Sequence, residues 1–326
     1  MIRLLFYLLP AMLCVAACTA PPAEPEDAPP VIAAADTLPD RTVAVTFDDL
    51  PAVAVPGDVS CDRAALTAFT DALLAEIGDV PTVGFVVEEQ VCDEDDLRAD
   101  LLGRWLDAGH GLGNHTAEHR DLNDLSVAEY TAGIVRGEAT TAPLLAARGD
   151  TLRYFRYPYL HAGDNEEKKT AVEDVLAERG YTIAPVTFDN DEWVFAAAYV
   201  RAAERGDTEG MERIGTAYVD YLEATFAHFE AWSSEVLGYE PPQVLLVHAN
   251  LLNADYFAAV ADRLRKRGYR FVTLDEAMED PVYGQPNGYV GESGPSWLHR
   301  WALDEGLKVK WEPDAPQWVW DLYEAR

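Results

Sequence analysis

Basic residues are scarce in this chain. Among its 326 residues, Lys and Arg number 25 against 57 Asp and Glu, only five of the bases are Lys, and the formal net charge is −32. So acidic a surface repels nucleic acids and other anionic polymers at long range. The composition therefore excludes nucleic acid as a partner and is compatible with a neutral or cationic polymer.

The N-terminus lacks an apolar run long enough to span a membrane. Residues 1–17 combine Arg3, an apolar stretch over 4–13 and small residues directly before Cys18, which indicates an export signal. The small residues resemble a bacterial lipobox, which implies cleavage before Cys18 and a lipid anchor on it; an ordinary signal peptide is the alternative. We therefore expect a lipoprotein of the cell envelope, on the periplasmic face of the outer membrane rather than the inner membrane.

Residues 18–40 have no hydrophobic period. They are rich in Pro, Ala and acidic residues, which predicts a flexible tether. Cysteine is rare in the rest of the chain, where only Cys61 and Cys92 remain, without the spacing of a metal site. An even pair in an exported protein favours a disulfide, although two buried free thiols would also fit.

Strand and helix patterns alternate from residue 41 to about residue 280, without an internal repeat or a glycine-rich phosphate loop. This order predicts an α/β fold with a parallel sheet, and the length fits a single (β/α) barrel. A helical insert is expected at about 194–240, and residues 281–326 form a Trp-rich extension that packs on the barrel of a monomer. The expected strands are 42–50, 82–87, 111–114, 154–159, 181–186, 243–248 and 270–273, and the expected helices are 62–77, 96–108, 126–147, 166–179 and 254–267.

Polar residues stand where the expected strands end. In a barrel, catalytic groups gather at the carboxyl ends of the strands. Asp48 and Asp49 could divide the work there, one binding a metal ion while the other takes a proton from water. Capping of a turn or helix is the alternative. The strand-end residues are Asp48, Asp49, His115, Arg156, Asp189 and His248.

His115 and His119 stand four residues apart. On a helical turn both imidazoles would face the same way, a spacing suited to one divalent ion. With Asp49 they would make a site of two His and one carboxylate, which leaves the open position that catalytic zinc requires. Two exposed histidines are the alternative.

Five motifs in this chain resemble those of the polysaccharide deacetylases with the NodB homology domain, carbohydrate esterase family 4. They follow the family order over residues 42 to about 278. The motifs are Thr46-Phe47-Asp48-Asp49, His115-Thr116-Ala117-Glu118-His119, Arg156-Tyr157-Pro158-Tyr159, the stretch Asp189 to Trp193, and Leu246-Val247-His248.

The resemblance implies a distorted, incomplete (β/α)7–8 barrel over residues 41–280 and one divalent metal ion, usually zinc. It makes Asp49, His115 and His119 the metal ligands, Asp48 the general base and His248 the general acid. Arg156 would orient Asp48, and Asp191 or Asp189 would tune His248. Substrate contacts would come from Tyr157, whose backbone amide would help to hold the oxyanion, from Tyr159, and from Trp193 in the acetyl pocket.

Three features depart from the family pattern. Leu50 replaces the Gly that usually follows the two acids and could crowd the substrate groove. Glu192 directly precedes Trp193, so the choice between Asp189 and Asp191 stays open. About 55 residues separate Trp193 from His248, longer than in the family pattern, and the aromatic residues of this insert could either wall the groove or form an ordinary core stripe.

The expected function is metal-dependent removal of N-acetyl groups from a polysaccharide that contains N-acetylglucosamine, of the peptidoglycan or chitin type. The enzymatic alternative is an O-acetyl esterase acting on xylan or another acetylated glycan. A catalytically silent glycan-binding lipoprotein is the alternative of a different class. The presence of both proton carriers, Asp48 and His248, argues against silence.

Overall fold

The computed structural model describes residues 41–57, 61–91 and 95–325. The expected signal peptide, the lipidated Cys18 and the tether lie outside these ranges. Cys61 is disulfide-bonded, as expected, while its expected partner Cys92 also lies outside the described residues. Among the described helices, none is both long and apolar enough to cross a membrane.

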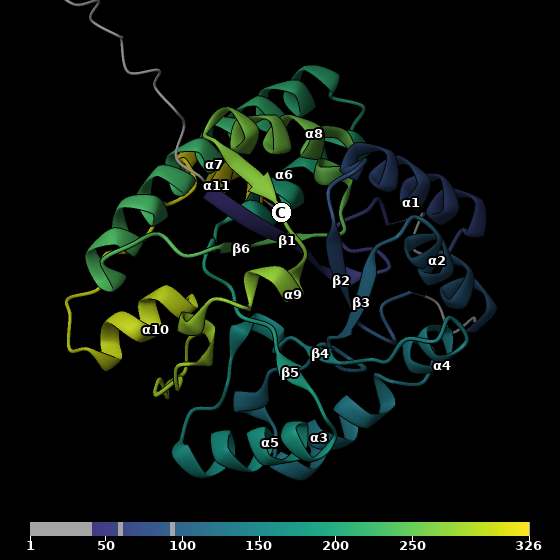
Figure 1. Ribbon diagram of the computed structural model, residues 1–326. Helices are drawn as coiled ribbons and strands as arrows, with labels where there is room; N and C mark the ends of the chain where they lie inside the picture. Colours follow the sequence, from purple (N-terminus) through teal and green to yellow (C-terminus); the bar gives the residue numbers. More distant parts are fainter. Residues whose placement is uncertain (1–40, 58–60, 92–94, 326) are drawn as a thin grey trace, which may run out of the picture. The chain divides into compact units, whose positions relative to one another are not determined.

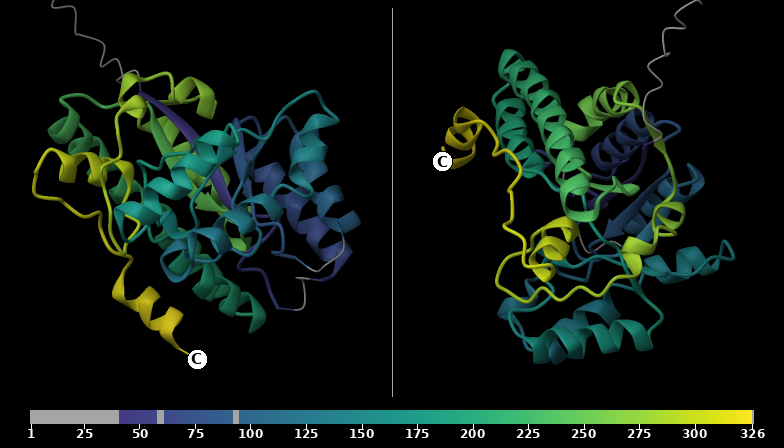
Figure 2. Two further views of the ribbon diagram at one scale, coloured as in Figure 1. Left: turned by 90° about the horizontal axis from the view of Figure 1, so that it is seen from below. Right: turned by 60° about the vertical axis from the view of Figure 1, so that its left-hand side comes forward.

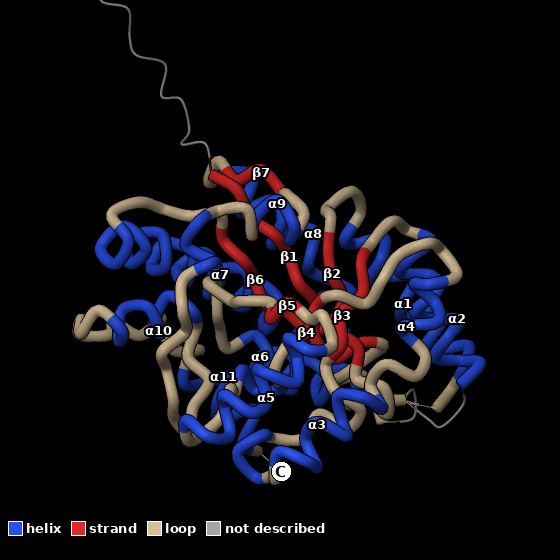
Figure 3. Tube along the Cα trace, turned by 60° about the horizontal axis from the view of Figure 1, so that its bottom comes forward, coloured by secondary structure: helices blue, strands red, loops and turns tan. Residues whose placement is uncertain are grey.

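A parallel sheet of seven strands lies at the centre (Figures 1 and 3). Its order is β5-β4-β3-β2-β1-β6, with β7 also paired to β1, and every pairing is parallel. The strands are β1 (Arg41–Leu50), β2 (Thr82–Val86), β3 (Gly111–Asn114), β4 (Tyr154–Phe155), β5 (Thr182–Ile183), β6 (Gln243–His248) and β7 (Tyr269–Phe271).

The two ends of this sheet approach each other after β5. Phe188 forms an isolated parallel bridge with Leu245 of β6, and the Thr187 amide donates to the Val244 carbonyl. The sheet therefore curls into a distorted (β/α) barrel, and the predicted α/β class with about seven parallel strands is confirmed. Because the strands are parallel, their C-terminal ends lie at the same end of the barrel.

Helices surround the sheet (Figure 3). Most begin at a side-chain cap, such as Asp62 before α1 and the Ser126–Glu129 capping box before α3. Two helices are present where the sequence predicted one over 126–147. The first, α3, ends at Arg136 with Gly137 as its cap, and α4 begins at Thr141. The helices up to the insert are α1 (Arg63–Ile77), α2 (Asp95–Asp107), α3 (Val127–Arg136), α4 (Thr141–Ala146) and α5 (Glu166–Glu178), with short 3-10 turns η1 (Leu122–Asp124) and η2 (Pro158–Leu160).

The expected insert consists of two helices, α6 (Glu192–Glu204) and α7 (Thr208–Leu237). The chain breaks between them at Gly206, whose φ is +67°, and Asp207 caps α7. The aromatic side chains of the insert are buried, so they form core rather than a wall of the groove. These are Tyr199, Tyr218, Tyr221, Phe226, Phe229 and Trp232.

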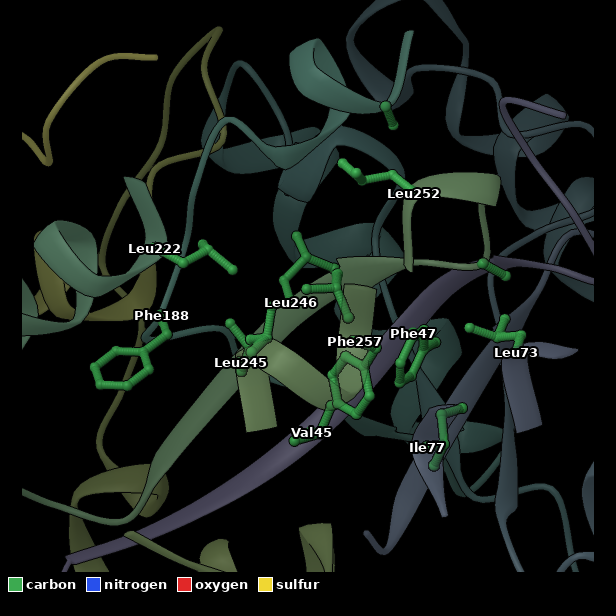
Figure 4. Close-up of a cluster of buried hydrophobic side chains, with 14 of the residues drawn as sticks. Val45, Phe47, Leu73, Ile77, Phe188, Leu222, Leu245, Leu246, Leu252 and Phe257 are labelled. Carbon is green, nitrogen blue, oxygen red and sulfur yellow. The ribbon is translucent and has the colours of Figure 1, made fainter. Parts of the chain in front are cut away.

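Apolar side chains of β1 and β6 build the largest core cluster (Figure 4). Val45 and Phe47 from β1 pack with Leu245 from β6 and with Phe257 from α8 (Leu251–Lys266), and the Phe47 and Phe257 ring centroids are 5.0 Å apart. Leu73 and Ile77 of α1 join the same cluster. This core fixes the strands whose ends carry the candidate site.

The C-terminal extension contains α10 (Trp297–Asp304) and α11 (Gln317–Glu324), after the short α9 (Leu274–Ala277) and η3 (Pro281–Gly284) (Figure 2). Trp297 and Trp301 are buried against the main cluster, and Trp318 and Trp320 are half-buried, as expected. Trp311 is 61% exposed and contacts the His299 ring, with the ring centroids 4.8 Å apart.

Candidate active site

A β-bulge near the end of β1 turns two consecutive acids toward one cavity. Phe47 pairs with Gly84 and Leu50 with Val86, so three steps along β1 match two steps along β2. The extra residue bends the strand, and Asp49 takes a φ of +62°. Neighbouring side chains of a regular strand point to opposite faces, and the bulge removes that restriction here.

Asp49, His115 and His119 come together at the carboxyl edge of the sheet. The Asp49 Oδ1 atom lies 3.3 Å from His119 Nε2 and 3.6 Å from His115 Nε2, and one ligand atom from each residue lies within 4.8 Å of the others. The expected helical turn is wrong, because residues 115–121 form a loop in which Thr116 and His119 have positive φ. The loop nonetheless brings the imidazoles of His115 and His119 close together.

The donor set fits a divalent ion. The His115 Nδ1–H donates to the Arg156 carbonyl at 2.8 Å, which turns the Nε2 lone pair toward Asp49. Burial, followed by nearby His119, lowers the pKa of His115 well below its ordinary value, so this imidazole is neutral as a ligand must be. The buried Asp49 Oδ1 has no hydrogen-bond partner among the described residues. Two nitrogens and a carboxylate oxygen are ligands that zinc accepts.

Asp48 faces a buried guanidinium. Both of its carboxylate oxygens lie 3.3 Å from Arg156 Nη1. Arg156 is itself held by the Ala184 carbonyl at 3.1 Å and by the Thr46 hydroxyl at 3.1 Å. Burial raises the pKa of Asp48, while Arg156 and then His248 act against this increase. Arg156 therefore contacts the carboxylate that the sequence predicted it to orient.

The buried Glu192 contacts His248. Its Oε2 lies 2.7 Å from His248 Nδ1, and its Oε1 accepts from the Asn250 and Asn253 side-chain amides. Burial opposes the charged imidazole, but Glu192, followed by Asp49 and Asp48, raises the pKa of His248 to about 9.

The direct partner of His248 is thus Glu192, whereas the sequence predicted Asp191 or Asp189 for this role. Asp191 Oδ2 accepts the Ala315 amide at 2.8 Å and so fastens the C-terminal extension. Asp189 lines the cavity, where burial and then nearby Glu312 raise its pKa to about 7. The sequence did carry a signal for Glu192, since this acid directly follows Asp191.

These groups line one cavity of about 470 Å³. Tyr159 and Trp193 line it and are 55% and 43% exposed, which suits the expected substrate contacts, whereas the Tyr157 ring is buried elsewhere. Leu50 is fully buried and leaves the cavity uncrowded. The other lining residues are Asp48, Asp49, Val53, Ala54, His115, His119, Leu160, Asp189, Asn190, Ala196, Leu246, His248, Asn250 and Gly294.

Strained backbone collects around this cavity. Six described non-glycine residues have a positive φ, and five of them line the cavity. Such conformations persist only where the surrounding structure enforces them, and they are common at functional sites. The five are Asp49, Ala54, His119, Tyr159 and Leu160.

A parallel α/β fold with an acid and an imidazole beside three converging ligand side chains is the arrangement of a hydrolytic enzyme. The polysaccharide deacetylase family model matches residues 35–184. This match covers less than half of the chain and supports a relationship to the polysaccharide deacetylases, which are hydrolases. The matched residues include Asp48, His115 and Arg156, and those beyond them include Glu192 and His248.

Several individual proteins are similar to this chain. A chitin deacetylase from Arthroderma benhamiae is 27% identical over 192 residues, which are 59% of this chain and 42% of that protein. The chain thus spans less than half the length of this curated relative. A mutant peptidoglycan deacetylase from Bacillus subtilis is 19% identical, with 76% of this chain and 95% of that chain covered and a TM-score of 0.47. A family 4 carbohydrate esterase from Streptomyces lividans is 18% identical, with 73% and 96% covered and a TM-score of 0.43.

Proposed function

We propose that this protein is a metal-dependent deacetylase that removes N-acetyl groups from a polysaccharide containing N-acetylglucosamine. One observation carries the proposal: an oriented acid, Asp48, and a charged imidazole, His248, flank the Asp49–His115–His119 cluster in a single cavity. Hydrolysis of an unactivated amide needs a base for the attacking water and an acid for the leaving amine. Both are in place.

Asp48 is the base in this proposal. Arg156 fixes its carboxylate, so the acid can take a proton from water as the water attacks the acetyl carbon. A divalent cation held by Asp49, His115 and His119 would supply Lewis-acid polarisation of the acetyl carbonyl.

His248 is the acid. With a pKa of about 9 it carries a proton at neutral pH and can give it to the sugar nitrogen as the C–N bond breaks. An amine is a poor leaving group unless it is protonated, whereas an alcohol leaves more easily. The strongly protonated His248 therefore favours N-deacetylation over the O-acetyl esterase alternative, and a silent binding protein would need neither proton carrier.

Acetate release tests the proposal. Purified protein is mixed with zinc and, in separate reactions, with acetylated chito-oligosaccharide, peptidoglycan and acetylated xylan. We expect acetate from one or both N-acetylated substrates, and none from His119→Ala or from metal-stripped protein. Acetate from xylan alone would establish the esterase alternative, and acetate from none of the three would favour a binding protein.

We further propose that the chain is lipid-anchored through Cys18 in the cell envelope, on the periplasmic face of the outer membrane. The support is the small-residue stretch before Cys18 and the absence of an Asp directly after it. Mass spectrometry of the protein purified from its membrane fraction should find an acylated N-terminal Cys18. An unmodified mature N-terminus at another residue would contradict this prediction.

A further inference from the structure

Residues 287–300 are hydrogen-bonded to the loop that carries Tyr159 and to neighbouring segments. Residues 287–300 lie beyond the region that the family model matches. The Gly291 amide donates to the Gly163 carbonyl at 3.2 Å, and the Trp297 amide donates to the Val186 carbonyl at 2.7 Å. Asn123 Nδ2 donates to the Glu292 carbonyl at 3.1 Å. The extension is therefore fastened directly beside the candidate site.

The loop at Tyr159 has an unfavourable backbone. Tyr159 and Leu160 have φ values of +57° and +56°, and two successive left-handed residues other than glycine cost free energy at each position. This conformation places the Tyr159 ring edge-on to His119, with the ring centroids 4.6 Å apart, where it also lines the cavity. Something outside the loop must therefore hold it.

Arg300 of α10 makes one contact that stabilises this loop. Its side chain is fully buried, its Nη2 donates to the Leu160 carbonyl at 2.5 Å, and its Nε donates to the Pro295 carbonyl at 2.8 Å. The guanidinium lies 4.1 Å from the Trp297 ring centroid, and no carboxylate of the described residues pairs with it. A buried cation without a paired acid is costly to place in a core. Its principal contact outside its own segment is the strained loop.

Gly294 supplies a second hold. A Cβ atom on this residue would lie 1.9 Å from the Tyr159 carbonyl oxygen and 2.9 Å from the Leu160 carbonyl carbon. Only glycine lets the extension pack so closely on these two peptide groups. Arg300 and Gly294 thus act on the same pair of residues from the same segment.

We propose that Arg300 and Gly294 are positioning residues that hold Tyr159 beside His119, which makes the segment 287–300 part of the substrate site. The exposed Tyr159 ring then forms a wall on which a neutral sugar ring packs. This substrate role rests on the proposed function. The backbone role does not.

Kinetics of Arg300→Met in two backgrounds test the substrate role. Acetylated chito-oligosaccharide is the substrate, and the backgrounds are the wild type and Tyr159→Ala. We expect Arg300→Met to raise KM about tenfold in the wild type with kcat nearly unchanged, the effect of one misplaced contact, and to change KM less than about twofold once Tyr159 is already Ala. Arg300→Lys, which keeps a donor, should recover part of the loss.

Arg213→Met is the matched control, because Arg213 lies 4.0 Å from the Trp318 ring of the same extension but does not line the cavity. It should leave KM unchanged. An equal KM increase from Arg300→Met in both backgrounds, or a loss of kcat alone, would overturn the substrate role.

Crystal structures of Gly294→Ala and of the wild type test the backbone role without any activity. The added methyl group should displace Tyr159 and Leu160 from the left-handed region, with loss of the Arg300–Leu160 hydrogen bond. Unchanged φ values at both residues would overturn the positioning claim. If the wild type hydrolyses no glycan, the proposed function fails, and this structural comparison still decides whether the segment positions the loop.

Discussion

Two neighbouring carboxylates acquire different chemistry at the end of β1. Asp48 lies against the buried guanidinium of Arg156, whereas Asp49 lies between two imidazoles. The bulge and the positive φ of Asp49 let both side chains reach one cavity while they contact different partners. Backbone geometry thus gives two identical neighbouring residues different surroundings.

At the same scale, Glu192→Gln should move the basic limb of the pH–rate profile to lower pH. His248 must be protonated to act as an acid, and its pKa of about 9 depends on Glu192, since burial alone would lower it. Gln keeps the shape but not the charge, so the pKa should fall and kcat/KM at about pH 8.5 should drop on the order of tenfold. Asp191→Asn is the control and should leave the limb in place.

The same substitution has a consequence for stability. A pKa raised from 6.5 to about 9 in the folded state stabilises the fold below pH 6.5, and this contribution is lost as the pH rises through 9. The difference in unfolding free energy between wild type and Glu192→Gln should therefore shrink over that window. Glu192 would not be the group that raises the pKa of His248 if the basic limb of the pH–rate profile stayed in place in Glu192→Gln and the difference in unfolding free energy stayed constant with pH.

Residue identities were predictable where a strand end fixes them. Asp48, Asp49, His115, Arg156 and His248 follow apolar runs, and parallel strands bring such ends together. The partner of His248 was not predictable in the same way. It depends on where α6 begins, and a shift of one residue at a helix start turns a side chain by about 100°.

At the scale of elements, β1 and β2 fit together at Leu50 and Gly84. A Cβ on Gly84 would lie 2.3 Å from Leu50 Cδ2, so the Leu that departs from the family pattern fills space that Gly84 leaves open. Gly84→Ala should lower the unfolding free energy by about 1–3 kcal/mol, the usual cost of overpacking. Thermal and denaturant unfolding measure it.

Leu50→Ala in the same chain provides the check. Alone it should be destabilising, because it removes a fully buried side chain. The double variant Leu50→Ala/Gly84→Ala should lose less unfolding free energy than the two single variants together. The smaller side chain at position 50 makes room for the methyl group at position 84. Strictly additive effects would show that the two residues do not compete for the same space.

Element boundaries show what periodicity can and cannot predict. Apolar spacing identified the strands and most helices, and the capping box at Ser126 was visible in the sequence. The break at Gly206 between α6 and α7 was missed, as was the loop of His115 and His119. In the loop, tertiary contacts select positive φ values that local propensity disfavours.

At the scale of the whole molecule, the formal charge of −32 should distinguish substrates by their own charge. Deacetylation leaves amines on the glycan, so a partly deacetylated chito-oligosaccharide is cationic and is attracted to this surface. Its KM should rise as salt increases from 20 mM to 500 mM, because salt screens the attraction. The KM of a fully acetylated oligosaccharide is the control and should change little; equal salt dependence would contradict the argument.

In the mechanism proposed here, Asp49 holds a metal ion while Asp48 moves a proton. Zinc titration of metal-stripped protein, followed by measurement of acetate release from the same samples, tests this division of roles most directly. We expect wild type to bind one zinc ion per chain and become active. Asp48→Asn should bind one ion and lose about 10² to 10⁴ in kcat, the usual range for a lost acid or base, whereas Asp49→Asn should lose tight zinc binding. Loss of zinc from Asp48→Asn with retention by Asp49→Asn would show that the two roles are exchanged, and full activity of both variants without zinc would contradict the mechanism.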